Sequence, residues 1–315
     1  MMILITGALG QLGTELTDYL RAQLSPEQVL ATDIRSPHLP TDGPFELLDV
    51  SDGNRLHALV KQYGVTQIYH LAAILSAKGE QQPLQTWEIN MGSWLKVLEV
   101  SRSAGIGKVY FPSSIAVFGS QTPGQNTPQF TYLAPETVYG MSKQAGELWG
   151  QYYFNRYGLD VRSIRYPGLI SYKNPPGGGT TDYAVEIFHA AIQGQPYTCF
   201  LDAHTYLPMM YMPDAVRATV ELMEAPADSL STHTGYNVSA MSFSPQELFE
   251  EIQRHFPDFS IRYAPDFRQK IAESWPDSFD DSLARQDWKW QPTYNLRWLT
   301  RDMIANLSHQ LLDTF

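Results

Sequence analysis

Two side chains that can move a proton lie four residues apart in the middle of the chain. Tyr139 and Lys143 belong to a helical pattern that runs from about Val138 to Tyr157. Residues four apart on a helix are neighbours on one face, so the Lys143 ammonium is expected near the Tyr139 phenol. A phenol with a pKa of about 10 is a poor base at neutral pH, but a nearby positive charge favours the phenolate. We therefore expect Tyr139 to accept a proton from a hydroxyl, with Lys143 supporting it.

A serine is expected beside this pair. Ser113 and Ser114 end the fifth predicted strand, upstream of the helix that carries Tyr139. The hydroxyl of one of these two serines can donate to a substrate oxygen and fix its orientation. The spacing alone is weak evidence, because 18 tyrosines and 8 lysines produce such pairs by chance, often on a solvated helix surface. The position after the strand is what favours a catalytic interpretation.

A glycine-rich turn near the N-terminus predicts a dinucleotide site. TGALGQLG places Gly7, Gly10 and Gly13 between a strand and a helix, where backbone N–H groups and the helix dipole favour a pyrophosphate. Asp33 ends the next strand, 20 residues after Gly13, where its carboxylate can accept from a ribose hydroxyl. Asp33 would also repel a 2′-phosphate, although Arg35 partly offsets this. NAD is therefore expected rather than NADP.

Further cofactor contacts are expected from residues that follow strand ends. Asp49 follows the third strand and can bind the adenine amino group, and the small residues of HLAA permit close approach of the backbone. Besides the glycines and Asp33, the residues expected to make such contacts are Leu12, Ile34, Asp49, Val50, Leu71, Ala72, Ala73 and Tyr166. His70, which begins HLAA, is expected to be a buried core histidine without a catalytic role.

The elements that must position these residues alternate between short apolar strands and helices. Strands are predicted at Met2–Thr6, Gln28–Asp33, Phe45–Leu48, Gln67–His70, Lys108–Ser113 and Asp160–Tyr166. Helices are predicted near Gln11–Leu24, Asp52–Tyr63, Gln81–Ala104 and Val138–Tyr157. This rhythm predicts an α/β fold with a doubly wound parallel Rossmann sheet.

After Tyr166 the pattern changes. The run YKNPPGGGTTDY is typical of a loop, Ser244 and Glu247 form a capping box, and another helix is expected from about Asn295 to Leu311. We predict an NAD-binding domain over residues 1–166. Residues 167–315 are expected to form a smaller α/β lid that binds the substrate, with the chain crossing back to the sheet.

Composition excludes several classes of protein. The chain has 315 residues, 43% of them hydrophobic and 17% charged, with a formal net charge of −11. An acidic globular chain without a long apolar run is not expected to bind nucleic acid or membranes. Cys199 is the only cysteine, which fits a reducing, cytoplasmic location, and the eight histidines lack metal-ligand spacing. Residues 166–315 hold 10 Lys and Arg against 19 Asp and Glu, and therefore most of the negative charge.

Together these motifs resemble the extended short-chain dehydrogenase/reductases. The resemblance rests on GxxGxxG, Asp33, HLAA, SSIAVFG and the Tyr139–Lys143 segment, and it covers essentially the whole chain. It implies that Ser114, Tyr139 and Lys143 form the catalytic triad, that Tyr139 and Lys143 also contact the cofactor, and that Asn90 belongs to the site. Such proteins often dimerise through the helices near residues 81–104 and 138–157. A homodimer is therefore expected, although Trp87, Trp94 and Leu98 there can equally face the protein's own sheet.

Within that family the chain departs from the nucleotide-sugar epimerases and dehydratases. Those enzymes typically read RYFN where this chain reads RYPG with Gly168, and they carry an arginine where Leu207 stands. The runs RYPGLISY, PGGGTTDYAVEIF and LPMMYMPDA are instead similar to the L-threonine 3-dehydrogenases of the short-chain type. That similarity implies NAD-dependent oxidation of L-threonine to L-2-amino-3-oxobutanoate.

A small zwitterion such as L-threonine needs donors for its carboxylate and an acceptor for its ammonium group. Ser76, Thr180 and Thr181 supply hydroxyls, Asp182 supplies the acceptor, and Ser114 and Tyr139 would hold the β-hydroxyl. Thr181 or Asp182 can alternatively serve only as a helix cap. The Met209–Met212 stripe is expected to be core. Two other functions stay open: a nucleotide-sugar epimerase or dehydratase, and an NAD-sensing protein without catalysis.

Overall fold

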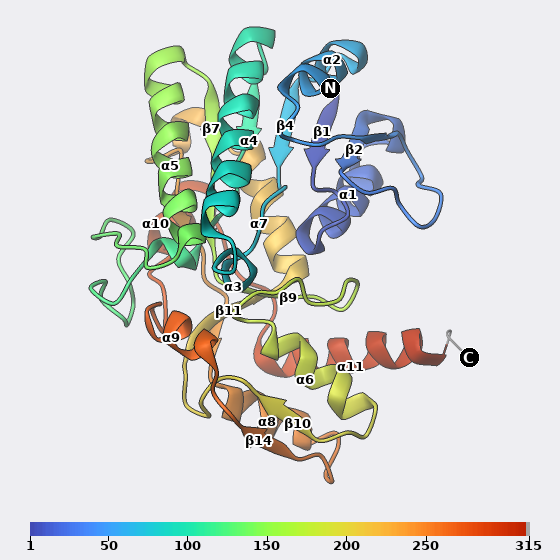
Figure 1. Cartoon of the computed structure of the whole chain (residues 1–315), viewed down its shortest axis with the longest axis vertical. Coiled ribbons are helices and arrows are strands. Elements are labelled where there is room, and N and C mark those ends of the chain that lie inside the picture. Colours follow the sequence, from blue (N-terminus) through green and yellow to red (C-terminus); the bar gives the residue numbers. More distant parts are fainter. Residues whose placement is uncertain (313–315) are drawn as a thin grey trace.

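The six predicted strands form one parallel sheet in the computed structural model, which describes residues 1–312 (Figure 1). Its order is β3-β2-β1-β4-β5-β7, with β1 at Ile3–Thr6, β2 at Val29–Asp33, β3 at Phe45–Leu47, β4 at Gln67–His70, β5 at Lys108–Tyr110 and β7 at Asp160–Arg162. The strand order reverses between β1 and β4, and open α/β sheets bind ligands beyond the strand ends at such a point. The predicted doubly wound Rossmann sheet is confirmed.

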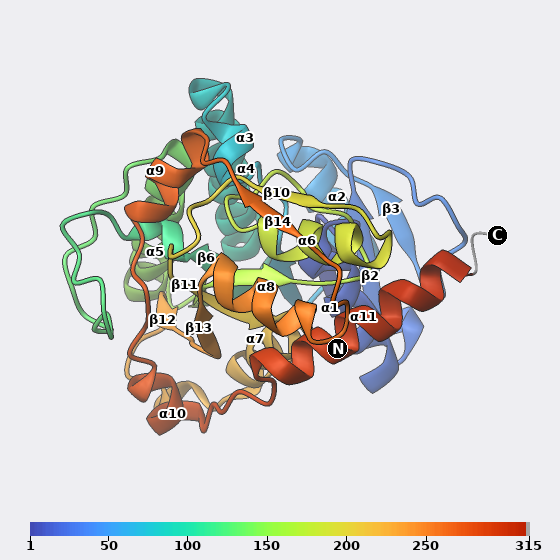
Figure 2. The ribbon, with the colours of Figure 1, turned by 90° about the horizontal axis from the view of Figure 1, so that it is seen from below.

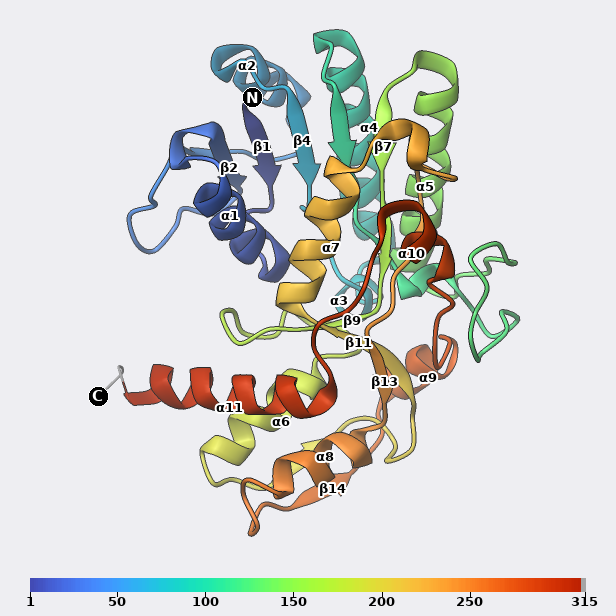
Figure 3. The same cartoon turned by 180° about the vertical axis from the view of Figure 1, so that it is seen from behind.

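Helices cover both faces of the sheet, which explains why its strands are apolar runs. Ile3 and Ile5 face one side, where they share a core with α1 (Gln11–Gln23) and α7 (Met212–Glu224). Leu4 faces the other side, covered by α2 (Gly53–Tyr63), α4 (Pro83–Ala104) and α5 (Val138–Tyr157). Figure 3 shows α1 and α7 in front of the sheet.

The last two predicted strands each divide into two. Pro112 lacks an N–H for the ladder, so β5 ends at Tyr110 and β6 (Ser113–Ser114) follows as a separate strand. Ser163 exchanges backbone hydrogen bonds with His233 and Tyr236, which separates β7 from β8 (Ile164–Tyr166). As a result β8 pairs with β6 on one side and with β12 (Tyr236–Asn237) on the other. Ser114 is thereby carried beyond the main sheet.

Most of the remaining strands and helices form the lid, which lies below the sheet in Figure 1 and nearest the viewer in Figure 2. It contains β9 (Gly168–Ile170), β10 (Tyr197–Cys199), β11 (Leu207–Tyr211), β13 (Met241–Phe243), β14 (Ile261–Tyr263), α6 (Tyr183–Ile192), α8 (Pro245–Gln253), α9 (Phe267–Glu273) and α11 (Leu296–Leu312). By contrast, α10 (Ser282–Trp288) shares the core of β1 and α7. The capping box predicted at the start of α8 is present, and the Met209–Met212 stripe is fully buried, as predicted. None of the helices within residues 1–312 has the length and apolar character needed to cross a membrane.

One buried guanidinium joins the two halves of the chain. Arg162, at the end of β7, is inaccessible to solvent and donates to the carbonyl oxygens of Leu222 and Ala225 at 2.6 and 2.7 Å, where α7 ends. It also forms a bidentate ion pair with Asp160. The end of α7, from the second half of the chain, is thereby joined to β7. The domain boundary at residue 166 and the return of the chain to the sheet stay predictions.

Candidate active site

Tyr139 lies in the first turn of α5. Thr137 caps this helix by accepting from the Gly140 N–H at 3.0 Å, and the Glu80 carboxylate accepts from the Val138 N–H at 2.8 Å. Glu80 directly follows α3 (Ser76–Gly79), so two separate segments fix the start of α5. The N-terminal end of a helix favours negative charge, and this position therefore supports a phenolate.

Gly140 brings α5 close to the segment that carries Ser114. A Cβ atom on Gly140 would lie 2.0 Å from the carbonyl oxygen of Ala116, in the short helix η2 (Ile115–Val117) that follows Ser114. Only a glycine permits this approach. The Ser114 side chain lies close enough to the Tyr139 phenol to lower the pKa of that phenol.

Burial shifts both titratable groups of the pair toward their neutral forms. Burial raises the pKa of Tyr139 to about 12, and the Ser114 side chain opposes the shift. Burial lowers the pKa of Lys143 to about 7. The Lys143 Nζ atom lies 5.3 Å from the centre of the Tyr139 ring and 4.7 Å from that of Phe111. Tyr139 and Lys143 are therefore close together, as predicted. A further positive charge near the Tyr139 phenol would favour its phenolate form.

His70 is a core residue, as the sequence analysis expected. Its Nδ1 atom lies 2.9 Å from the Thr6 hydroxyl and its Nε2 atom 3.2 Å from the Ser93 hydroxyl, while the ring stacks on Trp94. Burial, together with the charge of Lys143, lowers the pKa of His70 to about 3. The imidazole is neutral at physiological pH and both nitrogens have partners.

In the glycine turn, Gly7–Gly13, close contacts with neighbouring backbone require glycine at Gly7 and Gly13 but not at Gly10. Gly7 has a φ of 69°, and a Cβ there would lie 2.7 Å from the Ala72 N atom, so the turn rests on the HLAA segment. A Cβ on Gly13 would lie 2.2 Å from the Gly7 carbonyl oxygen. A Cβ on Gly10 would meet only that same oxygen, at 3.3 Å. The space beside Gly10, at the start of α1, therefore fits a pyrophosphate against the helix N-terminus.

Asp33 closes this turn from the end of β2. Its carboxylate accepts from the Leu9 N–H at 3.1 Å and from the Arg35 N–H at 3.2 Å, next to the glycine turn. Ile34 beside it is exposed. Farther along this edge, hydrogen bonds from Ser51 lower the pKa of Asp49, so that its carboxylate stays charged. The remaining predicted cofactor residues are Leu12 at the start of α1, the buried Val50, and Leu71, Ala72 and Ala73 after β4.

Two predicted cofactor residues have side chains committed elsewhere. Asn90 accepts from the Ile74 N–H at 2.8 Å and donates to the Ile74 carbonyl at 3.1 Å, so it holds the segment after β4. The Tyr166 hydroxyl accepts from Tyr110 at 2.6 Å and is hydrogen-bonded to Thr219 on α7. The backbone of Tyr166, and not its hydroxyl, is therefore the part that can contact a cofactor.

The predicted substrate residues meet across the loop that follows β9. The Ser76 and Thr180 hydroxyl oxygens are 3.2 Å apart and both residues are buried. Asp182 precedes α6, but its carboxylate does not cap that helix; its Oδ2 atom accepts from the N–H groups of Gly178 and Gly179 at 2.8 Å each. Burial raises the pKa of Asp182. The carboxylate thus shapes the loop, and its Oδ1 atom accepts no hydrogen bond from residues 1–312.

The sequence analysis missed a buried ion pair behind Ser114. Glu147 accepts from Ser113 at 2.5 Å and forms a bidentate pair with Arg165 at 2.8 and 2.9 Å. Both residues are buried. Glu147 stands four residues after Lys143 on the same helix, which is the signal that could have revealed it.

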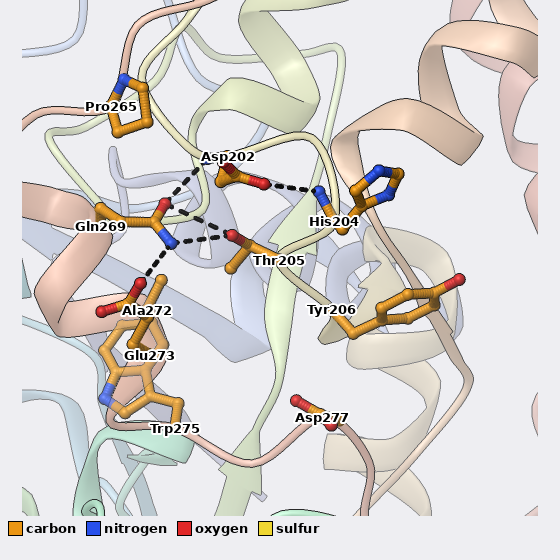
Figure 4. Close-up of a pocket in the computed structure, with 10 residues that line it drawn as sticks. All are labelled: Asp202, His204, Thr205, Tyr206, Pro265, Gln269, Ala272, Glu273, Trp275 and Asp277. Atoms are coloured by element: carbon orange, nitrogen blue, oxygen red, sulfur yellow. Dashed lines mark hydrogen bonds between the residues drawn. The ribbon is translucent and has the colours of Figure 1, made fainter.

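A pocket of about 400 Å³ lies in the lid and contains none of the predicted site residues (Figure 4). Its lining includes the carboxylates of Asp202, Glu273 and Asp277 but neither Lys nor Arg. Gln269 crosses it, hydrogen-bonded to Thr205 and Glu273 at 2.9 Å each. Within residues 1–312 no group of three or more His, Cys, Asp or Glu side chains is arranged to hold a metal ion.

Comparison with known proteins identifies the family. Residues 3–239 match the model of the NAD dependent epimerase/dehydratase family. This chain belongs to that family. It is an extended short-chain dehydrogenase/reductase of the oxidoreductase type, and its cofactor is NAD, as the fit of the glycine turn and Asp33 indicates.

Relatives and solved structures match along almost the whole chain. An uncharacterized epimerase/dehydratase of Staphylococcus aureus is 49% identical over 312 residues, covering 98% of this chain and 97% of the relative. The holo form of a GalE-like L-threonine dehydrogenase from Cupriavidus necator is 53% identical, with a TM-score of 0.96 and coverage of 98% and 100%. A monomeric L-threonine 3-dehydrogenase from a metagenome is 46% identical, with a TM-score of 0.96 and coverage of 98% and 99%.

Proposed function

We propose that this protein oxidises L-threonine to L-2-amino-3-oxobutanoate with NAD. The observation that carries the proposal is the contact between Ser76 and Thr180, two buried residues from distant segments of the chain. Their contact limits the size of the site, and their hydroxyls suit a polar substrate. The similarity to structures named L-threonine dehydrogenases supports the same substrate. The reaction would serve threonine degradation in the cytoplasm.

The proposed chemistry begins with the Ser114–Tyr139 pair. Ser114 donates a hydrogen bond to the β-hydroxyl oxygen, and the Tyr139 phenolate accepts the β-hydroxyl proton. Lys143 stabilises the phenolate by charge and passes the proton on toward water. Bound NAD would supply the acceptor for the hydride of the β-carbon, so that the O–H and C–H bonds break as the C=O bond forms.

The cofactor and the substrate would be held by separate groups. Gly10 and the start of α1 would receive the pyrophosphate, Asp33 the adenosine ribose, and Lys143 the nicotinamide ribose. The hydroxyls of Ser76, Thr180 and Thr181 would bind the threonine carboxylate. Asp182 would accept from its ammonium group through the free Oδ1 atom.

A nucleotide-sugar substrate is disfavoured at two positions of the lid. Leu207, where the epimerases typically carry arginine, is fully buried in β11. Gly168, where the epimerases typically carry asparagine, has no room for a side chain because Met209 and Thr181 fill that space. Neither position therefore supplies the polar side chain that those enzymes carry there.

We also propose that the protein forms a homodimer through α4 and α5. Leu84, Trp87 and Met141 are exposed on these helices and line a shallow apolar hollow. Trp94 and Leu98, which the sequence analysis also considered, are buried in the protein's own core.

The deciding experiment measures NADH formation by purified protein with NAD and L-threonine. Parallel reactions contain D-threonine, L-allo-threonine, or NADP in place of NAD. We expect NADH with L-threonine and NAD, and little in the other reactions. No NADH from L-threonine, combined with turnover of a UDP- or dTDP-sugar without net NADH, would replace the proposal with an epimerase or dehydratase activity.

A further inference from the structure

Gly168 occupies a fixed place close to the catalytic serine. It begins β9, two residues after Tyr166, and Tyr166 is the partner of Ser114 in the pairing of β8 with β6. Gly168 itself pairs with Met209 of β11, at the edge of the lid sheet. This pairing and the short link to β8 leave its backbone little freedom to move.

No side chain fits at Gly168 without displacing a neighbour. A Cβ there would lie 2.4 Å from the Met209 Sδ atom and 2.7 Å from the Thr181 Cγ2 atom, whereas real Cβ atoms essentially never come closer than 3.0 Å. Met209 is fully buried in the lid core, so its side chain can turn only at the expense of that packing. Thr181 has a short side chain, so it can avoid the clash only by rotating about χ1, which moves its hydroxyl, or by moving its backbone.

Thr181 belongs to a loop that is braced as a unit. The Asp182 carboxylate holds the N–H groups of Gly178 and Gly179, and Thr180 meets Ser76. A Cβ on Gly177 would lie 3.1 Å from the Leu75 Cδ1 atom, so the loop rests on the segment that leads to Ser76. A displacement of Thr181 is therefore transmitted to the Ser76–Thr180 contact.

We propose that Gly168 sets the upper size limit of the substrate by letting the Thr180–Asp182 segment close against β9. The proposal rests on the proposed function, and it restricts the substrate class to L-3-hydroxy amino acids with small side chains. A side chain at position 168 would push Thr181 outward, separate Thr180 from Ser76 and widen the site. Gly168 acts through these residues and is thus a positioning residue.

The test compares Gly168→Ala with Gly92→Ala. Gly92 lies on α4, and a Cβ there meets nothing within 4 Å, so this control adds the same methyl group without a clash. For Gly168→Ala we expect the KM for L-threonine to rise about tenfold, with kcat within about threefold and the KM for NAD unchanged. The ratio of kcat/KM for L-threo-phenylserine to that for L-threonine should rise about tenfold, because the larger side chain gains room.

Hydrogen exchange of residues 177–182 gives a readout that needs no activity. Exchange should be faster in Gly168→Ala than in the wild type and in Gly92→Ala. Adding Thr181→Ser removes the Cγ2 methyl and keeps the hydroxyl. In the double variant the exchange should slow again, and its threonine KM should fall toward that of Thr181→Ser alone. If Gly168→Ala does not fold, the double variant carries the test.

Unchanged substrate selectivity together with unchanged exchange of residues 177–182 would overturn the inference. The same loss of threonine affinity with and without Thr181→Ser would also overturn it, because the two sites would then be uncoupled. If the wild type does not oxidise L-threonine, the proposed function fails, and the exchange experiment alone decides whether Gly168 holds this segment closed.

Discussion

The Tyr139 hydroxyl is the group on which the proposed proton transfer depends. We expect Tyr139→Phe to lower kcat by a factor of about 10² to 10⁴ while NAD binding is retained, because the ring stays packed and only the base is lost. Stopped-flow or steady-state NADH formation measures the first effect, and cofactor titration measures the second. Tyr152→Phe, an exposed tyrosine on the same helix, is the matched control and should retain full activity. Near-normal turnover in Tyr139→Phe would remove Tyr139 from the mechanism.

His70 makes a prediction about acid stability. Its pKa is about 3 in the folded protein, against an ordinary value of 6.5. Below pH 6.5 the His70 imidazole binds a proton in the unfolded chain but stays neutral in the folded protein. The free energy of unfolding should therefore fall as the pH falls toward 3. The maximal slope is about 1.4 kcal/mol per pH unit for one group.

Urea unfolding of the wild type and His70→Gln between pH 7 and pH 4 checks this dependence. The variant is expected to be less stable at pH 7, because Thr6 and Ser93 lose a well-placed partner. Its stability should nevertheless depend less on pH than that of the wild type. If the free energy of unfolding of the two proteins depended on pH in the same way, His70 would take up its proton as readily in the folded protein as in the unfolded chain.

At the scale of elements, the Glu147–Arg165 pair fixes α5 against β6 and β8. Glu147→Gln leaves the Arg165 guanidinium buried without its counter-charge, and we expect a loss of about 3 kcal/mol in the free energy of unfolding. We also expect kcat to fall more than the affinity for NAD, because Ser113, next to Ser114, loses its charged acceptor. Chemical denaturation and steady-state kinetics measure the two effects.

Glu99→Gln is the control for this prediction. Glu99 pairs with Arg102 on α4, but its side chain is 52% exposed, and exposed ion pairs contribute about 0–1 kcal/mol. This variant should be nearly as stable and active as the wild type. Equal effects of the two substitutions would show that burial of the Glu147 pair is unimportant.

The elements also show why prediction from sequence succeeded in one part and not in another. Apolar runs and the glycine turn defined the strands because the central ones, β2, β1, β4 and β5, have residues buried on both faces. The break at Pro112 was missed although proline is a local signal for it. The break at Ser163 was not predicted, since its partners lie some 70 residues away in the chain. The same holds for Asn174, which donates to Thr14 at 2.8 Å and ties the loop after β9 to the glycine turn. Long-range contacts of this kind leave no local pattern.

At the scale of the whole molecule, the exposed apolar surface of α4 and α5 predicts a dimer. We expect the wild type to sediment as a dimer and Trp87→Glu combined with Met141→Glu to sediment as a monomer, because each charge would be buried in the interface. Leu39→Glu, an exposed leucine after β2, is the control and should leave the dimer intact. A monomeric wild type, as in the metagenome structure, would contradict the proposal.

The guanidinium of Arg162 has a consequence for fragments of this chain. A cut in the loop after Lys173 would separate Arg162 from the carbonyls of residues 222 and 225, to which it donates. The first fragment would then keep the Arg162 cation with only Asp160 as a partner, and the carbonyls at the end of α7 in the second fragment would lose their donor. Neither piece should fold well alone, yet both carry complementary surfaces. Co-expression of the two pieces should therefore reconstitute the molecule, which makes this loop a natural place to split the gene for a fragment-complementation reporter.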